Sequence, residues 1–151
     1  ITFTSGSTGI PKGIIRSHGF LHIQNQQVVS LLKPHSEDID LVSLPVFILS
    51  NLSSGIPTVI PSGPLKKPQS LDPAVLKASI ARHGITRLLV PPAICQQLVD
   101  HPLPCPTLQK IFTGGGPVFP DLLKKLKKIA PSAEIIIIFG STEAEPISHI
   151  A

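Results

Sequence analysis

The run TSGSTGIPKG, residues 4–13, separates a short apolar stretch from a helix-like segment, and this order decides the fold class. A strand, a glycine-rich loop and a helix are typical of an α/β fold. Three glycines let the backbone approach a ligand with its amides exposed, and four hydroxyls add hydrogen-bond donors. Because Lys12 adds a positive charge, the loop predicts a site for a polyphosphate.

This loop differs from the Walker sequence G-x-x-x-x-G-K-S/T. Counted from Gly6, Pro11 stands where the second glycine should be, and Gly13 replaces the Ser or Thr that holds magnesium. A flexible Gly/Ser linker is the alternative interpretation. However, linkers rarely set Pro-Lys-Gly between a strand and a helix.

Apolar strands and amphipathic helices alternate along the rest of the chain. The expected helices cover residues 17–32, 73–83, 93–99 and 121–130, and the expected strands cover 1–4, 40–44, 58–60, 86–90, 110–113 and 134–139. This order predicts an α/β fold with a largely parallel sheet and helices on both faces. Ligands of such sheets bind beyond the carboxyl ends of the strands, where we place the loops 5–13, 114–117 and 140–143.

The composition suits a sheet buried on both faces, since 42% of the residues are hydrophobic and 15% are charged. A net charge of +4 would permit a nucleic-acid partner. However, the chain has no Tyr or Trp to stack on bases, and four lysines between residues 124 and 128 lie on the polar face of a helix. We therefore expect no nucleic-acid partner.

Membrane and metal signals are weak in this sequence. The longest apolar run, residues 135–139, is too short to span a bilayer, so we expect no transmembrane segment. Cys95 and Cys105 form no C-x-x-C pair, which argues against a disulfide framework or a zinc site and fits a reducing cytoplasm. His18 and His22 lie one helical turn apart without a third ligand nearby, so we interpret them as solvated helix residues.

Three motifs resemble those of one enzyme superfamily, in the same order. They are residues 4–13, the turn TGGGP at 113–117 and the sequence FGSTE at 139–143. On these motifs the chain resembles the adenylate-forming (AMP-binding) superfamily of acyl-CoA synthetases, peptide-synthetase adenylation domains and luciferases. The resemblance implies that residues 1–151 are an internal segment of the large N-terminal domain, and that the C-terminal catalytic domain is absent.

The same resemblance implies roles for single residues. Lys12 would hold the β- and γ-phosphates of ATP, Phe139 would stack on adenine, and Thr142 would contact the reacting phosphate. Glu143 would hold Mg²⁺, a hard cation that prefers carboxylate oxygen. The implied nucleotide-binding residues are Thr4, Ser5, Gly6, Ser7, Thr8, Gly9, Lys12, Gly114, Gly115, Gly116, Pro117, Phe139, Gly140, Ser141 and Thr142. The implied catalytic residues are Lys12, Thr142 and Glu143.

The implied reaction joins a carboxylic acid to the α-phosphate of ATP and releases pyrophosphate. The acyl group then passes to CoA or another acceptor, such as a carrier protein. The family also uses an Asp for the ribose, an Arg near the hinge and a Lys in the C-terminal domain, all expected beyond Ala151. We therefore expect an acyl-AMP-forming ligase of the acid–thiol type whose residues 1–151 are inactive alone. A relative that binds nucleotide without turnover is the alternative.

The acyl substrate is indicated by residues 44–55, which match a segment that helps to line the acyl pocket in the family. This segment contains no acid to pair with the ammonium of an amino acid, and an unpaired buried ammonium would be costly. Val46, Phe47, Ile48 and Leu52 instead suggest a fatty acid, although some of them could be sheet core. The sequence TEAEPI at 142–147 also resembles fatty-acid-type members, including the olefin-pathway β-lactone synthetases.

Overall fold

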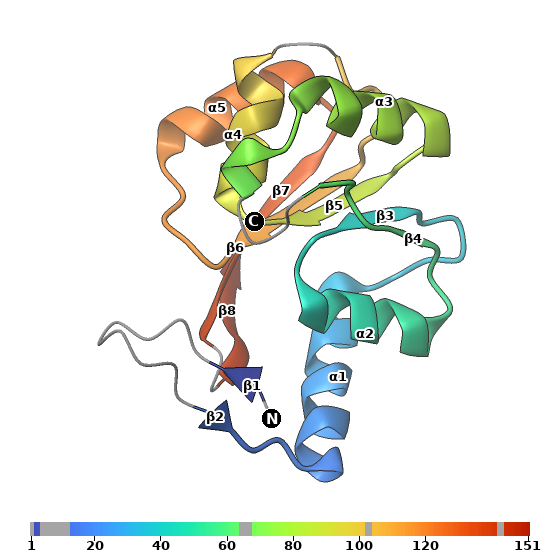
Figure 1. The fold of residues 1–151 in the computed structure, drawn as a ribbon, viewed down its shortest axis with the longest axis vertical. Coiled ribbons are helices and arrows are strands. Elements are labelled where there is room, and N and C mark those ends of the chain that lie inside the picture. Colours follow the sequence, from blue (N-terminus) through green and yellow to red (C-terminus); the bar gives the residue numbers. More distant parts are fainter. Residues whose placement is uncertain (1, 4–12, 64–67, 102–103, 142–143) are drawn as a thin grey trace.

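A computed structural model describes residues 2–3, 13–63, 68–101, 104–141 and 144–151. Among them, six strands form one sheet in the order β4-β3-β5-β6-β7-β8 (Figure 1). Their bounds are Asp40–Val42 (β3), Thr58–Val59 (β4), Arg87–Val90 (β5), Lys110–Gly114 (β6), Glu134–Ser141 (β7) and Ala144–Ile150 (β8). The strands from β4 to β7 are parallel and β8 is antiparallel to β7. The expected α/β class with a largely parallel sheet is confirmed.

Two further strands lie at the start of the chain. β1 (Thr2–Phe3) pairs in antiparallel fashion with β2 (Gly13–Ile14). Phe3 and Gly13, the residues on either side of 4–12, therefore lie opposite each other. β8 extends from the main sheet toward this pair in Figure 1.

Two helices, α1 and α3, begin at a residue whose side chain caps the first turn. In α1 (His18–Leu32), the hydroxyl of Ser17 accepts from the backbone N–H of Phe20 at 3.1 Å. In α3 (Pro73–His83), Asp72 caps the first turn and Gly84 ends the helix with a φ of 60°. The remaining helices start at prolines, which suit the first turn, and are α2 (Pro45–Ser54), η1 (Pro68–Ser70), α4 (Pro92–Asp100) and α5 (Pro120–Ile129).

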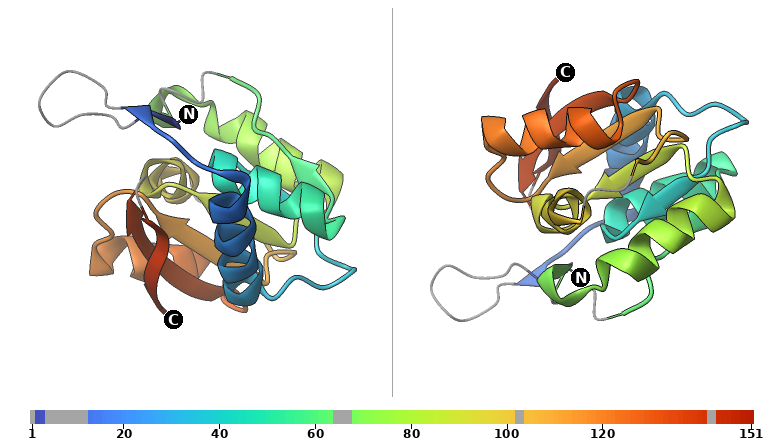
Figure 2. Two further views of the ribbon diagram at one scale, coloured as in Figure 1. Left: turned by 90° about the horizontal axis from the view of Figure 1, so that it is seen from below. Right: turned by 90° about the horizontal axis from the view of Figure 1, so that it is seen from above.

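The sheet separates two cores, because successive strand residues point to opposite faces. One face carries Leu88 and Ile111 and packs against α3, α4 and α5; we call this the α3–α5 core. The other face carries Leu89 and Phe112 and packs against α1 and α2; we call this the α1–α2 core. Figure 2 shows the two groups of helices from opposite sides of the molecule.

Several elements differ from the sequence-based expectation. Residues 45–54 form a helix, α2, where no element was expected. Residues 144–150 form the edge strand β8, and Gly140 and Ser141 extend β7, although 140–143 were expected to be a turn. β2 was also missed, because two residues give no periodic pattern.

Candidate active site at the carboxyl ends of the strands

The glycine-rich turn begins at the end of β6, and a glycine is favoured at each of its three positions for a different physical reason. A Cβ on Gly114 would overlap the carbonyl oxygen of Ile138 on β7, so this glycine lets the two strands approach. Gly115 has a φ of 76°, which side chains disfavour. Gly116 would place a Cβ 3.9 Å from Pro92, in ordinary contact with its ring. Gly116 is exposed, so its backbone is open to a flat ligand.

The end of β7 lies beside this turn, because Gly114 pairs with Ile138 in the β6–β7 ladder. The next residue, Phe139, is 62% exposed, so its ring is available to a ligand. Gly140 is close to β8, and a Cβ there would lie 3.2 Å from the Cγ of Glu145. The structure thus brings the second predicted motif and the described part of the third motif to one edge of the sheet.

Several predicted site residues lie outside the described residues. They are Thr4, Ser5, Gly6, Ser7, Thr8, Gly9, Lys12, Thr142 and Glu143. The neighbouring residue Gly13 begins β2, and Ser141 ends β7. Across the described part of the chain, no cluster of three His, Cys, Asp or Glu could hold a metal. The phosphate and Mg²⁺ roles therefore stay predictions.

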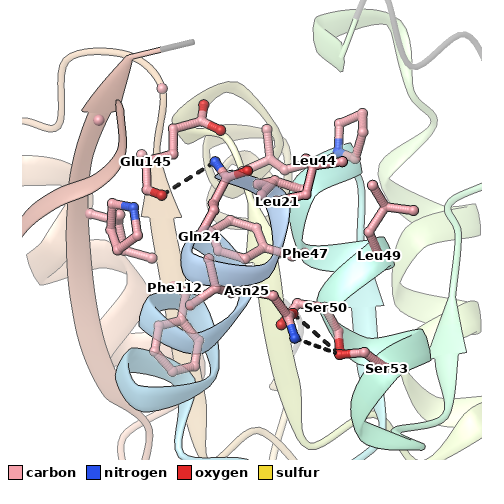
Figure 3. A pocket seen from close by; sticks show the side chains of 18 of the residues that line it. Leu21, Gln24, Asn25, Leu44, Phe47, Leu49, Ser50, Ser53, Phe112 and Glu145 are labelled. Carbon is pink, nitrogen blue, oxygen red and sulfur yellow. Dashed lines mark hydrogen bonds between the residues drawn. The ribbon is translucent and has the colours of Figure 1, made fainter. Parts of the chain in front are cut away.

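A cavity of about 690 Å³ opens beside this edge, between α1, α2 and the sheet (Figure 3). Its volume falls within the range of small-molecule sites. Its walls are mostly apolar. The lining residues are Arg16, Leu21, His22, Gln24, Asn25, Val28, Leu44, Pro45, Val46, Phe47, Leu49, Ser50, Ser53, Phe112, Thr113, Gly114, Gly115, Ile138, Gly140, Glu145 and Pro146.

The four predicted acyl-pocket residues all lie on α2 but face different ways. Val46 and Phe47 line the cavity. Ile48 packs against the α1–α2 core instead, and Leu52 is 72% exposed. Leu49, Ser50 and Ser53, which were not predicted, share the cavity face with Val46 at helical spacing.

Helix α1 forms the opposite wall, which the sequence reasoning missed. Leu21, Gln24, Asn25 and Val28 line the cavity at positions i, i+3, i+4 and i+7. This spacing marks one face of a helix and was visible in the sequence. The two polar members concealed it, because Gln24 and Asn25 do not fit an apolar stripe.

A polar cluster lies at the cavity end nearest Gly140. Arg16 Nη1 donates to Gln24 Oε1 at 2.9 Å, and Gln24 Nε2 donates to the carbonyl oxygen of Glu145 at 3.3 Å. The Arg16 guanidinium lies 4.0 Å from the Glu145 carboxylate and over the ring of Phe20. Burial raises the pKa of the Glu145 carboxyl, and the Arg16 charge offsets this only in part.

A second polar cluster lies at the other end of the cavity, where α1 meets α2 (Figure 3). Asn25 Nδ2 donates to Ser53 Oγ at 2.9 Å, and Ser53 Oγ donates to the carbonyl oxygen of Ser50 at 2.8 Å. Ser50 is 3% exposed, and its hydroxyl has no hydrogen-bond partner among the described residues. The two clusters leave an apolar passage between them.

Behind the glycine-rich turn, the Cys95 thiol donates to Thr113 Oγ1 at 3.6 Å. Burial raises the pKa of Cys95 to about 11, so the thiol is neutral at physiological pH. A neutral buried thiol is a poor nucleophile. Cys95 therefore supports the turn by packing.

The sequence pattern of AMP-binding enzymes matches residues 1–151, from the first motif to beyond the third. The chain belongs to the AMP-binding enzyme family. The predicted superfamily is thereby confirmed.

Relatives within this family carry several names. The chain is 34% identical over 151 residues to an olefin β-lactone synthetase of Stenotrophomonas maltophilia, covering 99% of this chain and 27% of the relative. It is 31% identical to a 2-succinylbenzoate–CoA ligase of Geobacillus kaustophilus, covering 100% of this chain and 31% of the relative. The chain thus spans about a third or less of the length of these relatives.

Solved structures show the same fold. The chain matches O-succinylbenzoate coenzyme A synthetase (MenE) of Bacillus subtilis, in complex with ATP and magnesium, with a TM-score of 0.80 and 22% identity over 99% of this chain and 31% of that chain. It matches VinN, in complex with L-aspartate, with a TM-score of 0.81 and 23% identity over 98% of this chain and 38% of that chain. Within the described residues, no helix is long and apolar enough to cross a membrane.

Proposed function

We propose that residues 1–151 are an internal segment of the N-terminal domain of a longer acyl-AMP-forming ligase. This enzyme would join a carboxylic acid to the α-phosphate of ATP and release pyrophosphate. The carrying observation is that the cavity reaches Gly114, Gly115 and Gly140, which are also predicted nucleotide-binding residues. A carboxylate at that end of the cavity would therefore meet a nucleotide bound at the sheet edge.

Each part of the site has a proposed task in this reaction. The open backbone at Gly116 and the exposed ring of Phe139 would hold adenine. Lys12 and the amides of its loop would hold the β- and γ-phosphates, which positions the α-phosphate for attack. Magnesium held by Glu143 would neutralise charge on the phosphates. Little covalent chemistry then falls to the protein itself.

The acyl group is proposed to be a fatty acid. The cavity walls are mostly apolar, and α2 contributes no acid to them. The lining acid Glu145 already has the Arg16 guanidinium 4.0 Å away. A substrate ammonium would have to compete with that guanidinium, whereas an apolar chain gains about 0.8 kcal/mol for each buried methylene. CoA would then accept the acyl group.

A β-lactone product is a second candidate. The two curated relatives at 34% and 32% identity are both named olefin β-lactone synthetase. Under this alternative, a hydroxyl on the carbon β to the carboxyl carbon would attack the acyl carbon and release AMP, so the ring would close without an external thiol. Mass spectrometry of products formed with and without CoA separates the two outcomes, because a thioester requires CoA and a lactone does not.

The proposed function is tested by carboxylate-dependent pyrophosphate release in the full-length protein. A panel of fatty, aryl and α-amino acids should give release with fatty acids, and Lys12→Ala should lose about ten- to a hundredfold of kcat/KM, as expected for one charge-assisted hydrogen bond. Adenylation is contradicted if pyrophosphate release does not require a carboxylic acid, or if no acid of the panel gives pyrophosphate release. A preference for an α-amino acid contradicts the fatty-acyl part alone.

A further inference from the structure

The cavity has a buried floor and an exposed rim. Its floor is formed by buried side chains of α1, α2 and β6, namely Val28, Phe47, Phe112 and Thr113. Its rim carries two leucines from different helices (Figure 3). Leu21 of α1 and Leu49 of α2 both line the cavity and are both exposed, Leu49 to 62%. The cavity is therefore open to solvent where these two leucines lie.

A hydrogen bond links the two helices close to this rim. Asn25 Nδ2 of α1 donates to Ser53 Oγ of α2 at 2.9 Å. Leu21 and Leu49 each lie one helical turn before one of these residues, on the same face of their helix. An acyl chain that leaves the cavity between α1 and α2 would therefore pass beside this hydrogen bond and contact both leucines.

Single exposed leucines are common on protein surfaces. Leu21 and Leu49 differ because they border a cavity that also reaches Gly114 and Gly140, where the proposed reaction places the substrate carboxylate. A chain that starts there and follows the apolar floor arrives at the rim as it lengthens. Its next methylene groups would cover the two leucines and remove apolar surface from water, which favours binding.

We propose that the acyl chain leaves the cavity between α1 and α2 and passes over Leu21 and Leu49, so that its distal end lies outside the cavity. This inference rests on the proposed adenylation function. It narrows the substrate class to long-chain acids, and it predicts that the cavity sets no upper limit on the length of the chain or on the size of its distal end.

The first experiment measures pyrophosphate release by the full-length protein with saturated fatty acids from hexanoic to stearic acid. On the buried floor each added methylene should raise kcat/KM about fourfold. Beyond the rim the gain should become smaller, because only one side of the chain contacts protein, and kcat/KM should then level off. A sharp fall beyond one chain length overturns the exit and leaves adenylation standing. No release from any acid overturns adenylation, and the exit with it.

The second experiment tests the open end directly. A long-chain acid with a pyrene group on its terminal carbon should release pyrophosphate with a kcat/KM within about threefold of that of the plain acid, because the pyrene would lie outside the cavity. A closed cavity would exclude so large a group. Release from the plain acid without release from the pyrene acid therefore overturns the exit.

The third experiment assigns the contact to the two leucines. Leu21→Ser and Leu49→Ser should each lower kcat/KM for palmitic acid about three- to tenfold and leave hexanoic acid unchanged. Ile23→Ser is the matched control, because Ile23 is 57% exposed on α1 and does not line the cavity. It should keep the ratio between the two acids. A ratio unchanged in both leucine variants, or lowered equally in the control, overturns the assignment.

Thermal unfolding distinguishes contact with the substrate from burial against another part of the full-length protein. Leu49→Ser and Ile23→Ser both replace an exposed apolar residue of a helix by serine, so they should unfold at similar temperatures without substrate. A clearly lower midpoint in Leu49→Ser would mean that further chain covers this leucine. That outcome contradicts an open exit at the rim.

Discussion

Gly114 and Gly116 stand two residues apart in the same turn, but the space around them differs. Gly114→Ala should cost about 1–3 kcal/mol of stability, because its Cβ would overlap the backbone of Ile138. Gly116→Ala, with nothing nearer than 3.9 Å, should keep stability and weaken nucleotide binding. Urea unfolding and ATP titration measure the two effects. Equal stability of the two variants would contradict this division of roles.

Glu145 gives the folded protein a pH-dependent stability. Its pKa is raised from 4.5, so the folded chain binds this proton more tightly than the unfolded chain. The contribution to stability is therefore present at low pH and is lost as the pH rises through the folded pKa. Glu145→Gln should unfold at a higher temperature than the parent protein at about pH 8 and match it at about pH 4. A difference in unfolding temperature between the two proteins that does not change with pH would contradict a raised pKa of Glu145.

At the scale of elements, one buried network joins both cavity helices to the sheet. Arg87 on β5 donates to both carboxylate oxygens of Asp40 on β3, each at 2.7 Å. It also donates to the carbonyl oxygen of Leu32 at the end of α1, at 3.1 Å, and pairs with Asp38 at 2.9 Å. Asp40 in turn accepts from Asn51 of α2 at 2.8 Å. The network therefore sets where α1 and α2 face each other.

Breaking this network should be costly. Asp40→Ala would leave Arg87 with one carboxylate partner and would remove one of the two acceptors of Asn51 Nδ2, so we expect a loss of about 3–5 kcal/mol in urea unfolding. Added salt should change this loss little, because the groups are buried. The control is Asp121→Asn, which removes the exposed pair with Lys125 and should be close to the parent protein. A loss of equal size in both variants would show that burial is not the cause.

Elements with strong local signals were predictable from the sequence, and those governed by tertiary contacts were not. Asp72-Pro73 at the start and Gly84 at the end predicted α3. Helix α2 has the opposite pattern, since it buries Ser50 and Asn51 while it exposes Leu49 and Leu52. A helix that buries polar residues beside a cavity gives no apolar stripe to recognise. β8 was missed for a similar reason, because an edge strand with mostly exposed residues lacks strict alternation.

At the scale of the whole molecule, the meeting of the turn after β6 with the end of β7 could be predicted, but the walls of the cavity could not. The parallel sheet places strand ends at one edge, which is why the turn after β6 and the end of β7 lie together. Which α1 side chains line the cavity depends on how that helix packs against the sheet, and therefore on residues that are distant in the chain. Gln24, for example, bonds to Glu145, which is 121 positions later.

Residues 1–151 should not catalyse adenylation when they are produced alone. The chain spans 27% of the first curated relative, and the family resemblance places the ribose Asp, the hinge Arg and the C-terminal Lys beyond Ala151. We expect no carboxylate-dependent ATP–pyrophosphate exchange above that of a Lys12→Ala control. Exchange above this control would show that the described fold, with its loops, is sufficient for the reaction.

The separation of the two cores bears on how this family diversifies. None of the buried residues of the α3–α5 core lines the cavity, whereas Phe47 and Phe112 of the α1–α2 core do. Substitutions that reshape the cavity therefore fall on one side of the sheet, and the stability supplied from the other side is preserved, since distant sites act almost independently. Under the proposed function, a change of acyl substrate would therefore involve α1 and α2 and would leave the α3–α5 core unchanged. For directed evolution, this confines a substrate library to two helices and the strand residues beneath them.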